Sequence, residues 1–360
     1  MMDDKNQAKL TSNGALAPGL STFFLPGLFF LVAIVGLFYV KWSPYYDRVF
    51  VAAATHSIGS SIITGKLAAA PLPSWDAALN YAVSYFTAVW KAVILGLLLG
   101  SLVQVLIPRN WVTRFLGGEN FRSTAAAGAA SLPGMMCSCC AAPVTVGLRA
   151  RSASVGAALA FFLGNPVLNP ATIIFMGFVL SWKFALLRIV AGTIMVFGIA
   201  TLANRIDKTD TVPASLLEDN TAPLAHNSLF VNWMRALGRL IIDTIPAYLI
   251  IVFLLGALRA WLFPAVGPEW NNSILVILGL AITGTLFVVP TAAEIPVIQT
   301  LMSFGLGVGP AATLLMTLPA VSLPSILIIK RAFSTKVLLF VLAAVAAVGV
   351  LSGLIATVVL

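Results

Sequence analysis

Charged side chains are scarce in this sequence. Only 9% of the 360 residues are Asp, Glu, Lys or Arg, whereas 60% are hydrophobic. A water-soluble domain carries roughly 25% charged residues, so this chain has too little polar surface to face water. The composition excludes an ordinary soluble protein and predicts one that folds in a lipid bilayer. The formal net charge of +9 then indicates membrane orientation and contact with anionic lipid, not nucleic-acid binding.

Cysteine is also rare, and its placement excludes a disulfide framework. All 3 cysteines lie in one tetrapeptide, Cys137-Ser138-Cys139-Cys140, whereas a disulfide framework spreads its cysteines along the chain. With 2 histidines, both in polar segments, a closed four-ligand zinc site is not expected. The sequence has no G-x-x-x-x-G-K-[ST] motif, so nothing indicates a nucleotide site. We predict no cofactor.

Long apolar runs predict membrane helices, each of which needs about 20 predominantly apolar residues. The candidate spans are 20–40, 80–107, 153–180, 183–203, 237–263, 309–329 and 336–360. Two further apolar stretches, 123–148 and 273–303, are interrupted by Pro and Gly. The run at 20–40 lacks an A-x-A-like cleavage site, so we expect a membrane helix there and not a cleaved signal peptide.

The two halves of the chain resemble each other. One register matches pairs of residues: Pro143-Val144 with Pro296-Val297, Pro166 with Pro319, and Lys183 with Lys336. Such self-similarity indicates an internal repeat. We therefore predict these segments: a cytoplasmic N-terminal tail (1–19), a first transmembrane helix with an interfacial segment (20–79), repeat one (80–204), a polar cytoplasmic linker (205–232) and repeat two (233–360).

Loop charges predict that the repeats are inverted. The loops 108–122 and 148–153 of repeat one are rich in Arg, and their counterparts 264–272 and 302–308 contain no base. Basic loops stay in the cytoplasm, so equivalent loops fall on opposite sides, as in inverted-repeat transporters. Inversion requires an odd number of crossings per repeat. The predicted fold is an all-α membrane protein with an N-terminal helix plus two inverted repeats. Each repeat has three spanning helices and a Pro/Gly-broken re-entrant hairpin, and nine full transmembrane helices is the alternative.

The two interrupted stretches are the predicted site. Pro133, Gly134 and Pro143 flank the cysteines, and Pro290-Thr291 and Glu294 to Pro296 occupy the matching place in repeat two. Broken backbone at membrane depth is tolerated only where it is buried in protein or lines a wet cavity. We expect the breaks to meet around a solute near the midplane. The predicted substrate-binding residues are Cys137, Ser138, Cys139, Cys140, Pro143, Asn165, Asn169, Pro290, Thr291, Glu294 and Pro296.

Several of these residues have a structural interpretation beside the functional one. Asn165-Pro166 and Asn169-Pro170 place two amides on one helix face, which lines a cavity or only serves helix packing. Soft thiolates at Cys137 and Cys139 suit a thiophilic metal or metalloid, although buried cysteines also behave as small apolar residues.

Three charges inside the predicted spans are candidates for coupling to protons. Burial raises the cost of ionising a carboxyl such as Glu294, and its alternative role is a hydrogen bond that closes the hairpin. Lys91 and Asp243 lie at nearly equivalent positions in the two repeats, so they form either a structural ion pair or a second coupling group.

The motifs resemble those of a known family, the ArsP/YraQ-type predicted permeases. The similar segments are Cys-Ser-Cys-x-x-x-Pro-Val at 137–144, Gly156 to Pro170, Pro290 to Gln299 and Leu318 to Ser325, and the resemblance covers about residues 80–350. It implies a multi-pass permease of the bacterial inner membrane, and some members are similar to efflux permeases for trivalent organoarsenicals, in which vicinal thiols bind the metalloid. Cys140 departs from the family pattern, where a small residue such as Gly is expected.

The predicted function is therefore an inner-membrane secondary transporter and not an enzyme. It moves a small solute, either a thiophilic metalloid such as a trivalent organoarsenical or a sulfur-containing anion, through the repeat interface. A membrane thiol-redox enzyme and a non-transporting subunit of a complex are the alternatives. The expected partners are the substrate and the lipid bilayer, with a homo-oligomer or partner protein left open and the N-terminus in the cytoplasm.

Overall fold

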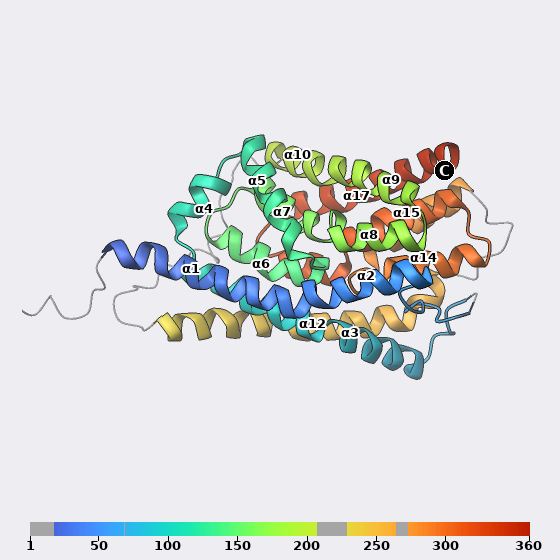
Figure 1. The fold of residues 1–360 in the computed structure, drawn as a ribbon, viewed down its shortest axis with the longest axis horizontal. Helices are drawn as coiled ribbons and strands as arrows, with labels where there is room; N and C mark the ends of the chain where they lie inside the picture. The colour runs from blue at the N-terminus through green and yellow to red at the C-terminus, as the bar shows by residue number, and fades with distance from the viewer. Residues whose placement is uncertain (1–17, 68, 207–228, 264–272) are drawn as a thin grey trace, which may run out of the picture.

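The described part of the protein is helical and rich in membrane-spanning segments. The computed structural model describes residues 18–67, 69–206, 229–263 and 273–360 (Figure 1). Within them the regular structure is helical, apart from one isolated bridge between Ser61 and Gly65. Seven helical segments are long and apolar enough to cross a bilayer: Phe23–Thr55, Trp75–Leu106, Val155–Val179, Trp182–Ile206, Leu229–Leu262, Val308–Ile329 and Thr335–Val359. The predicted all-α membrane fold is confirmed. Most of the predicted N-terminal tail and linker, and the loop 264–272, lie outside the described residues.

The first helix is longer than the apolar run at 20–40 indicates. α1 (Pro18–Leu37) continues through a π-helical turn, η1 (Phe38–Trp42), into α2 (Ser43–Thr55). Figure 1 shows this blue helix running along most of the molecule. A π turn inserts a residue into the helix and is frequent at functional sites. Here it turns Lys41 inward, where the side chain is 5% exposed.

The remaining described helices fall into two halves of the chain. The first half comprises α3 (Trp75–Leu106), α4 (Arg109–Leu116), α5 (Phe121–Ser131), α6 (Ser138–Ala150), α7 (Val155–Val167), α8 (Pro170–Val179), α9 (Trp182–Thr193), the π turn η3 (Ile194–Gly198) and α10 (Ile199–Ile206). The second comprises α12 (Leu229–Leu262), α13 (Ile274–Leu286), α14 (Glu294–Ser303), α15 (Val308–Ala320), α16 (Leu323–Ile329) and α17 (Thr335–Val359).

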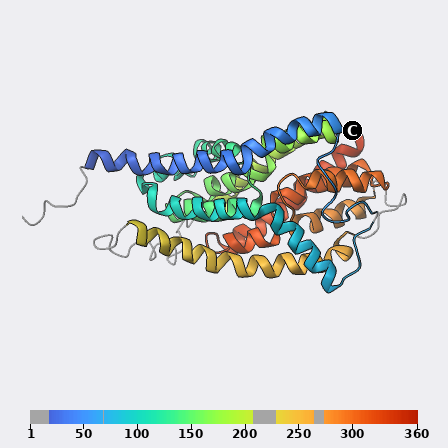
Figure 2. The same cartoon turned by 60° about the horizontal axis from the view of Figure 1, so that its bottom comes forward.

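The first long helices of the two halves run in opposite directions, and helices of one half pack on helices of the other. In Figures 1 and 2, α3 runs antiparallel to α12, against which it packs. α6 packs on α16 of the other half, and α14 packs reciprocally on α8.

Both interrupted stretches form pairs of short helices. Residues 132–137 separate α5 from α6, and residues 287–293 separate α13 from α14. None of these four helices exceeds 13 residues, so each is shorter than the roughly 20 residues that cross a bilayer. Met135 and Ala292 adopt positive φ values of 47° and 68°, which turns the chain sharply inside each break.

Close packing between α3 and α6 fixes the position of the first break. Gly96 and Gly100 of α3 form a small-x-x-x-small pair, which lets helix backbones approach closely in membranes. A Cβ atom at Gly96 would lie 2.5 Å from the carbonyl oxygen of Cys140, and one at Gly100 would lie 2.6 Å from the backbone of Pro143. α6 is therefore seated directly on the backbone of α3, and every residue of α6 is buried.

Candidate functional site

Each break exposes a backbone carbonyl that an aromatic side chain satisfies. Trp42 Nε1 donates to the carbonyl oxygen of Pro133 at 2.8 Å, and the hydroxyl of Tyr81 donates to the carbonyl oxygen of Val288. Val288 is buried, and a buried carbonyl without a partner is costly. These two bonds therefore help to hold both breaks open as irregular backbone.

A large cavity, here called the vestibule, reaches the second break. Its volume is about 870 Å³, and its walls come from η1 and α2, the segment 58–71, α3, α12 and residues 290–296. Among the described residues that line it, none is acidic and four are basic: Lys41, Arg48, Lys91 and Arg259. Low-dielectric walls bearing charge of one sign focus the potential and concentrate ions of the opposite sign. The vestibule is therefore suited to an anion.

Lys41 is the innermost of these bases. Its Nζ donates to Tyr45 Oη at 3.2 Å and to Thr291 Oγ1 at 3.1 Å. Both partners are neutral hydroxyls, and the side chain is 5% exposed. A buried ammonium is normally paired with a carboxylate, and among the described residues no carboxylate pairs with Lys41, so Lys41 brings positive charge to the second break.

Beyond Thr291 lies a much smaller cavity, here called the occluded cavity. Its volume is about 10 Å³, close to the space that one water molecule occupies. Its lining includes Cys137 from the first break and Thr291 and Glu294 from the second, together with Pro166, Pro290 and Pro319. The two breaks therefore meet here, and Thr291 borders both cavities.

Arg188 connects the two halves beneath this cavity. It is fully buried in α9, and its Nη1 lies 2.9 Å from Oε1 of Glu294, which is also buried. Its Nε and Nη2 donate to the carbonyl oxygens of Val167 and Pro166 at 2.9 and 2.7 Å. A cation at the C-terminus of α7 also complements the helix dipole.

Two prolines leave backbone carbonyls without helical hydrogen bonds, and Arg188 binds these carbonyls. Pro170 has no N–H group, so the carbonyl of Pro166 has no helical partner. In the same way Pro319 leaves the carbonyl of Leu315 free, and Arg188 Nη1 lies 3.5 Å from that oxygen. One guanidinium thus satisfies a proline-generated carbonyl in each half. Arg188 was not among the predicted site residues, although an Arg inside the apolar run 182–193 is itself a signal of function or pairing.

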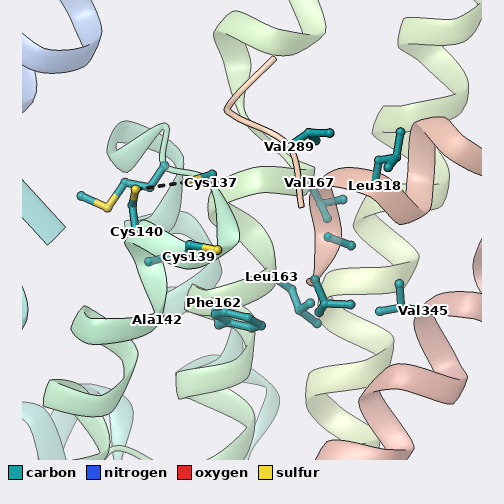
Figure 3. Close-up of a cluster of buried hydrophobic side chains, with 14 of the residues drawn as sticks. Cys137, Cys139, Cys140, Ala142, Phe162, Leu163, Val167, Val289, Leu318 and Val345 are labelled. Atoms are coloured by element: carbon teal, nitrogen blue, oxygen red, sulfur yellow. Dashed lines mark hydrogen bonds between the residues drawn. The ribbon is translucent and has the colours of Figure 1, made fainter. Parts of the chain in front are cut away.

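The three thiols point to different partners. Cys137 Sγ donates to Cys140 Sγ at 3.1 Å, as Figure 3 shows, whereas Cys139 Sγ lies 3.4 Å from Ser322 Oγ. The structure therefore joins Cys137 to Cys140 and not to Cys139. These two cysteines have C-x-x-C spacing, a sequence signal from which their pairing could have been predicted. Within the described residues, no group of three or more His, Cys, Asp or Glu side chains could hold a metal ion.

The two asparagines are buried but line neither cavity. Asn165 Nδ2 donates to the carbonyl oxygen of Phe161 at 2.9 Å. Asn169 caps α8 through the N–H groups of Ala171 and Thr172. Among the described residues, Asn165 Oδ1 and Asn169 Nδ2 have no hydrogen-bond partner. α7 ends and α8 begins between the two asparagines, so their amides do not share one helix face.

The remaining predicted residues lie at the edges of the site. Ser138 Oγ is 3.3 Å from Ser322 Oγ, which caps α16 as Asn169 caps α8. Pro143 and Pro296 lie inside α6 and α14, and Pro296 also lines the vestibule.

The two predicted coupling charges of α3 and α12 are not joined to each other. Asp243 forms an ion pair with Arg331, and its side chain is 49% exposed. Lys91 is exposed at the vestibule, with Nζ 5.6 Å from the centroid of the Trp90 ring.

Comparison with known proteins identifies relatives over most of the chain. The family model ArsP_1, described as a predicted permease, matches residues 125–358. The UPF0718 protein YraQ of Escherichia coli (strain K12) is 54% identical over 329 residues, which cover 91% of this chain and 93% of that protein. The UPF0718 protein MJ0584 of Methanocaldococcus jannaschii is 24% identical and covers 75% of this chain and 92% of its own length. No solved structure matches.

Proposed function

Because the chain belongs to the ArsP_1 family of predicted permeases, we propose that it carries a small anion through the vestibule and the two breaks. The family and the seven apolar helices make it a multi-pass membrane permease and not an enzyme. The anion class, the route and the coupling are the parts that we propose. For its location we propose the bacterial inner membrane, with the N-terminus in the cytoplasm, because the segment 108–122, which carries Arg109, Arg114 and Arg122, is basic.

The observation that carries the anion proposal is the environment of Lys41. Its ammonium is buried, its two partners are hydroxyls, and no described residue that lines the vestibule is acidic. A bound anion would supply the missing counter-charge and accept charge-assisted hydrogen bonds from Lys41 and Thr291. Of the two solute classes that the sequence leaves open, this environment favours the sulfur-containing anion over the neutral metalloid.

The antiparallel course of α3 and α12 supports inverted repeats with alternating access. In this proposal, the anion enters through the vestibule and passes Thr291 into the space between the breaks. That space must widen, because the occluded cavity has room for only about one water molecule. Glu294 is the proposed coupling group, since it lines that cavity and its Oε2 has no partner among the described residues. Because Glu294 is paired with Arg188 of the other half, a change in the charge of Glu294 would act on the contact between the two halves.

A second candidate function rests on the thiols. Cys137 and Cys140 lie within 3.1 Å of each other, and Cys137 lines the occluded cavity. Such a dithiol could bind a trivalent organoarsenical between two sulfurs, as the family resemblance implies. This candidate uses the same route but does not explain the basic vestibule.

The anion proposal is tested by transport into proteoliposomes. Radiolabelled thiosulfate and sulfate serve as the anions, and methylammonium serves as the cationic comparison. A charge-assisted hydrogen bond contributes about 1.5–3 kcal/mol, so Lys41→Met should weaken anion binding by about 10–100-fold. Lys41→Arg should retain most of the affinity because it keeps the charge.

The matched control is Lys66→Met, since Lys66 is an exposed lysine of the segment 58–71 that does not line the vestibule. Anion uptake that is equally strong in Lys41→Met and in the unmodified protein would contradict the proposal. Faster uptake of methylammonium than of either anion would contradict it too.

A further inference from the structure

An apolar groove opens on the side of the first break, separate from the vestibule. Its volume is about 330 Å³, and it lies between α1, α3, α4, α6 and the residues of the first break. We call it the acyl groove. Every described residue in its lining is apolar or a tryptophan, including Phe30, Trp111, Phe115 and Met136. Such a cavity excludes the anion proposed above but matches a hydrocarbon chain.

The acyl groove is open at its mouth and closed at its floor. Phe30 and Phe115 are 51% and 59% exposed, whereas Met136 and Val144 are 2% and 5% exposed. The outer face of α1 beside the mouth is also apolar, with Leu31 60% exposed. In a membrane that face lies against lipid tails, so the groove opens toward hydrocarbon chains.

Basic residues flank the mouth on α4. This helix places Trp111, Val112 and Phe115 in the groove, while Arg109 and Arg114 are exposed on the same eight-residue helix. The guanidinium carbon of Arg114 lies 5.8 Å from the centroid of the Phe115 ring. An amphipathic helix with aromatic and basic residues is typical of the lipid–water interface, where basic side chains attract anionic headgroups.

We propose that the acyl groove binds one acyl chain of an anionic phospholipid, with Arg114 at its headgroup. The bound chain fills the space behind the first break, because Pro133, Gly134 and Trp42 also line the groove. Trp42 holds the carbonyl of Pro133, so the lipid supports the conformation of the break from the side opposite the solute.

The experiment titrates phosphatidylglycerol with brominated acyl chains into the full-length protein in detergent micelles. Bromine quenches nearby tryptophan fluorescence, and the difference between the unmodified protein and Trp111→Phe isolates the signal of Trp111. The comparison lipid is phosphatidylcholine with the same brominated chains. We expect phosphatidylglycerol to bind more tightly. Arg114→Gln should weaken its binding about fivefold and leave phosphatidylcholine unchanged, and Lys336→Gln, an exposed base elsewhere, should change neither.

Filling the groove tests the position of the chain. Ala130 is exposed and lines the groove, so Ala130→Phe should fold, with unchanged circular dichroism, and should abolish quenching by both lipids. Equal binding of the two lipids with no effect of Arg114→Gln would overturn the proposed contact between Arg114 and an anionic headgroup. Undiminished quenching in Ala130→Phe would overturn the groove as the site. A dimer that shields Trp111 from every brominated lipid would show that a second copy covers it, and would also overturn the proposal.

Discussion

Removal of Arg188 should destabilise the protein more than removal of its partner Glu294. In Arg188→Met, Glu294 becomes a buried carboxylate with no cation, and the carbonyls of Pro166 and Val167 lose their donors. Breaking a buried ion pair on one side costs about 3–5 kcal/mol, and each orphaned carbonyl adds about 1–3 kcal/mol. The loss is therefore at least about 5 kcal/mol, which is a large part of the stability of a typical domain.

Glu294→Gln should be much milder. The amide oxygen of Gln can still accept from Arg188 Nη1, and the guanidinium keeps its carbonyl partners on α7. The double variant Arg188→Met/Glu294→Gln removes the uncompensated charge, so it should be more stable than Arg188→Met alone by about 2 kcal/mol or more, a coupling typical of contacting residues.

The assay is the free energy of unfolding from SDS titration in mixed micelles, followed by circular dichroism. All three variants are measured in the same detergent, so that the double-mutant cycle closes. If the double variant is less stable than Arg188→Met, then the ion pair does not dominate the environment of Glu294. A loss below about 1 kcal/mol in Arg188→Met, the range of an exposed pair, would refute the buried geometry itself.

Two further predictions concern the thiols and the packing of the first break. If the Cys137–Cys140 dithiol binds methylarsenite, Cys137→Ser and Cys140→Ser should each abolish binding measured by isothermal titration calorimetry. Cys139→Ser should retain binding, because Cys139 contacts Ser322. Loss of binding only in Cys139→Ser would contradict this pairing. Gly100→Ala should lower the free energy of unfolding by about 1–3 kcal/mol, because its Cβ would meet the Pro143 backbone. The control Gly279→Ala, which meets nothing within 4 Å, should be neutral or stabilising, and equal destabilisation of both would contradict the close packing.

The sequence predicted which residues belong to the site better than it predicted which residues they contact. Pro133, Pro290 and their neighbours mark both breaks, and the structure has irregular backbone at each. Thr291, Glu294 and Cys137 were chosen as site residues, and they line one cavity. Cys137 and Cys139 were the two thiols predicted to bind a thiophilic solute, whereas the structure brings Cys140 next to Cys137.

The vestibule could not be predicted because its wall was assigned to the membrane surface. The residues after 40 were expected to be interfacial, yet the helix continues to Thr55 through a π turn. A π turn depends on one extra residue being accommodated by the surrounding packing, so no local pattern announces it. Lys41 was therefore not chosen as a site residue, although it is buried against Thr291.

By itself the sequence determined that this protein folds in a lipid bilayer, that it has seven apolar helices and where proline interrupts them. These follow from composition and backbone chemistry, since lipid offers no hydrogen bonds and a proline removes one wherever it occurs. Only the tertiary structure decided that Lys41 meets Thr291 and that Arg188 meets Glu294. The reason is that lipid is as apolar as the protein interior, so hydropathy does not distinguish the helix face that meets another helix from the face that meets the bilayer.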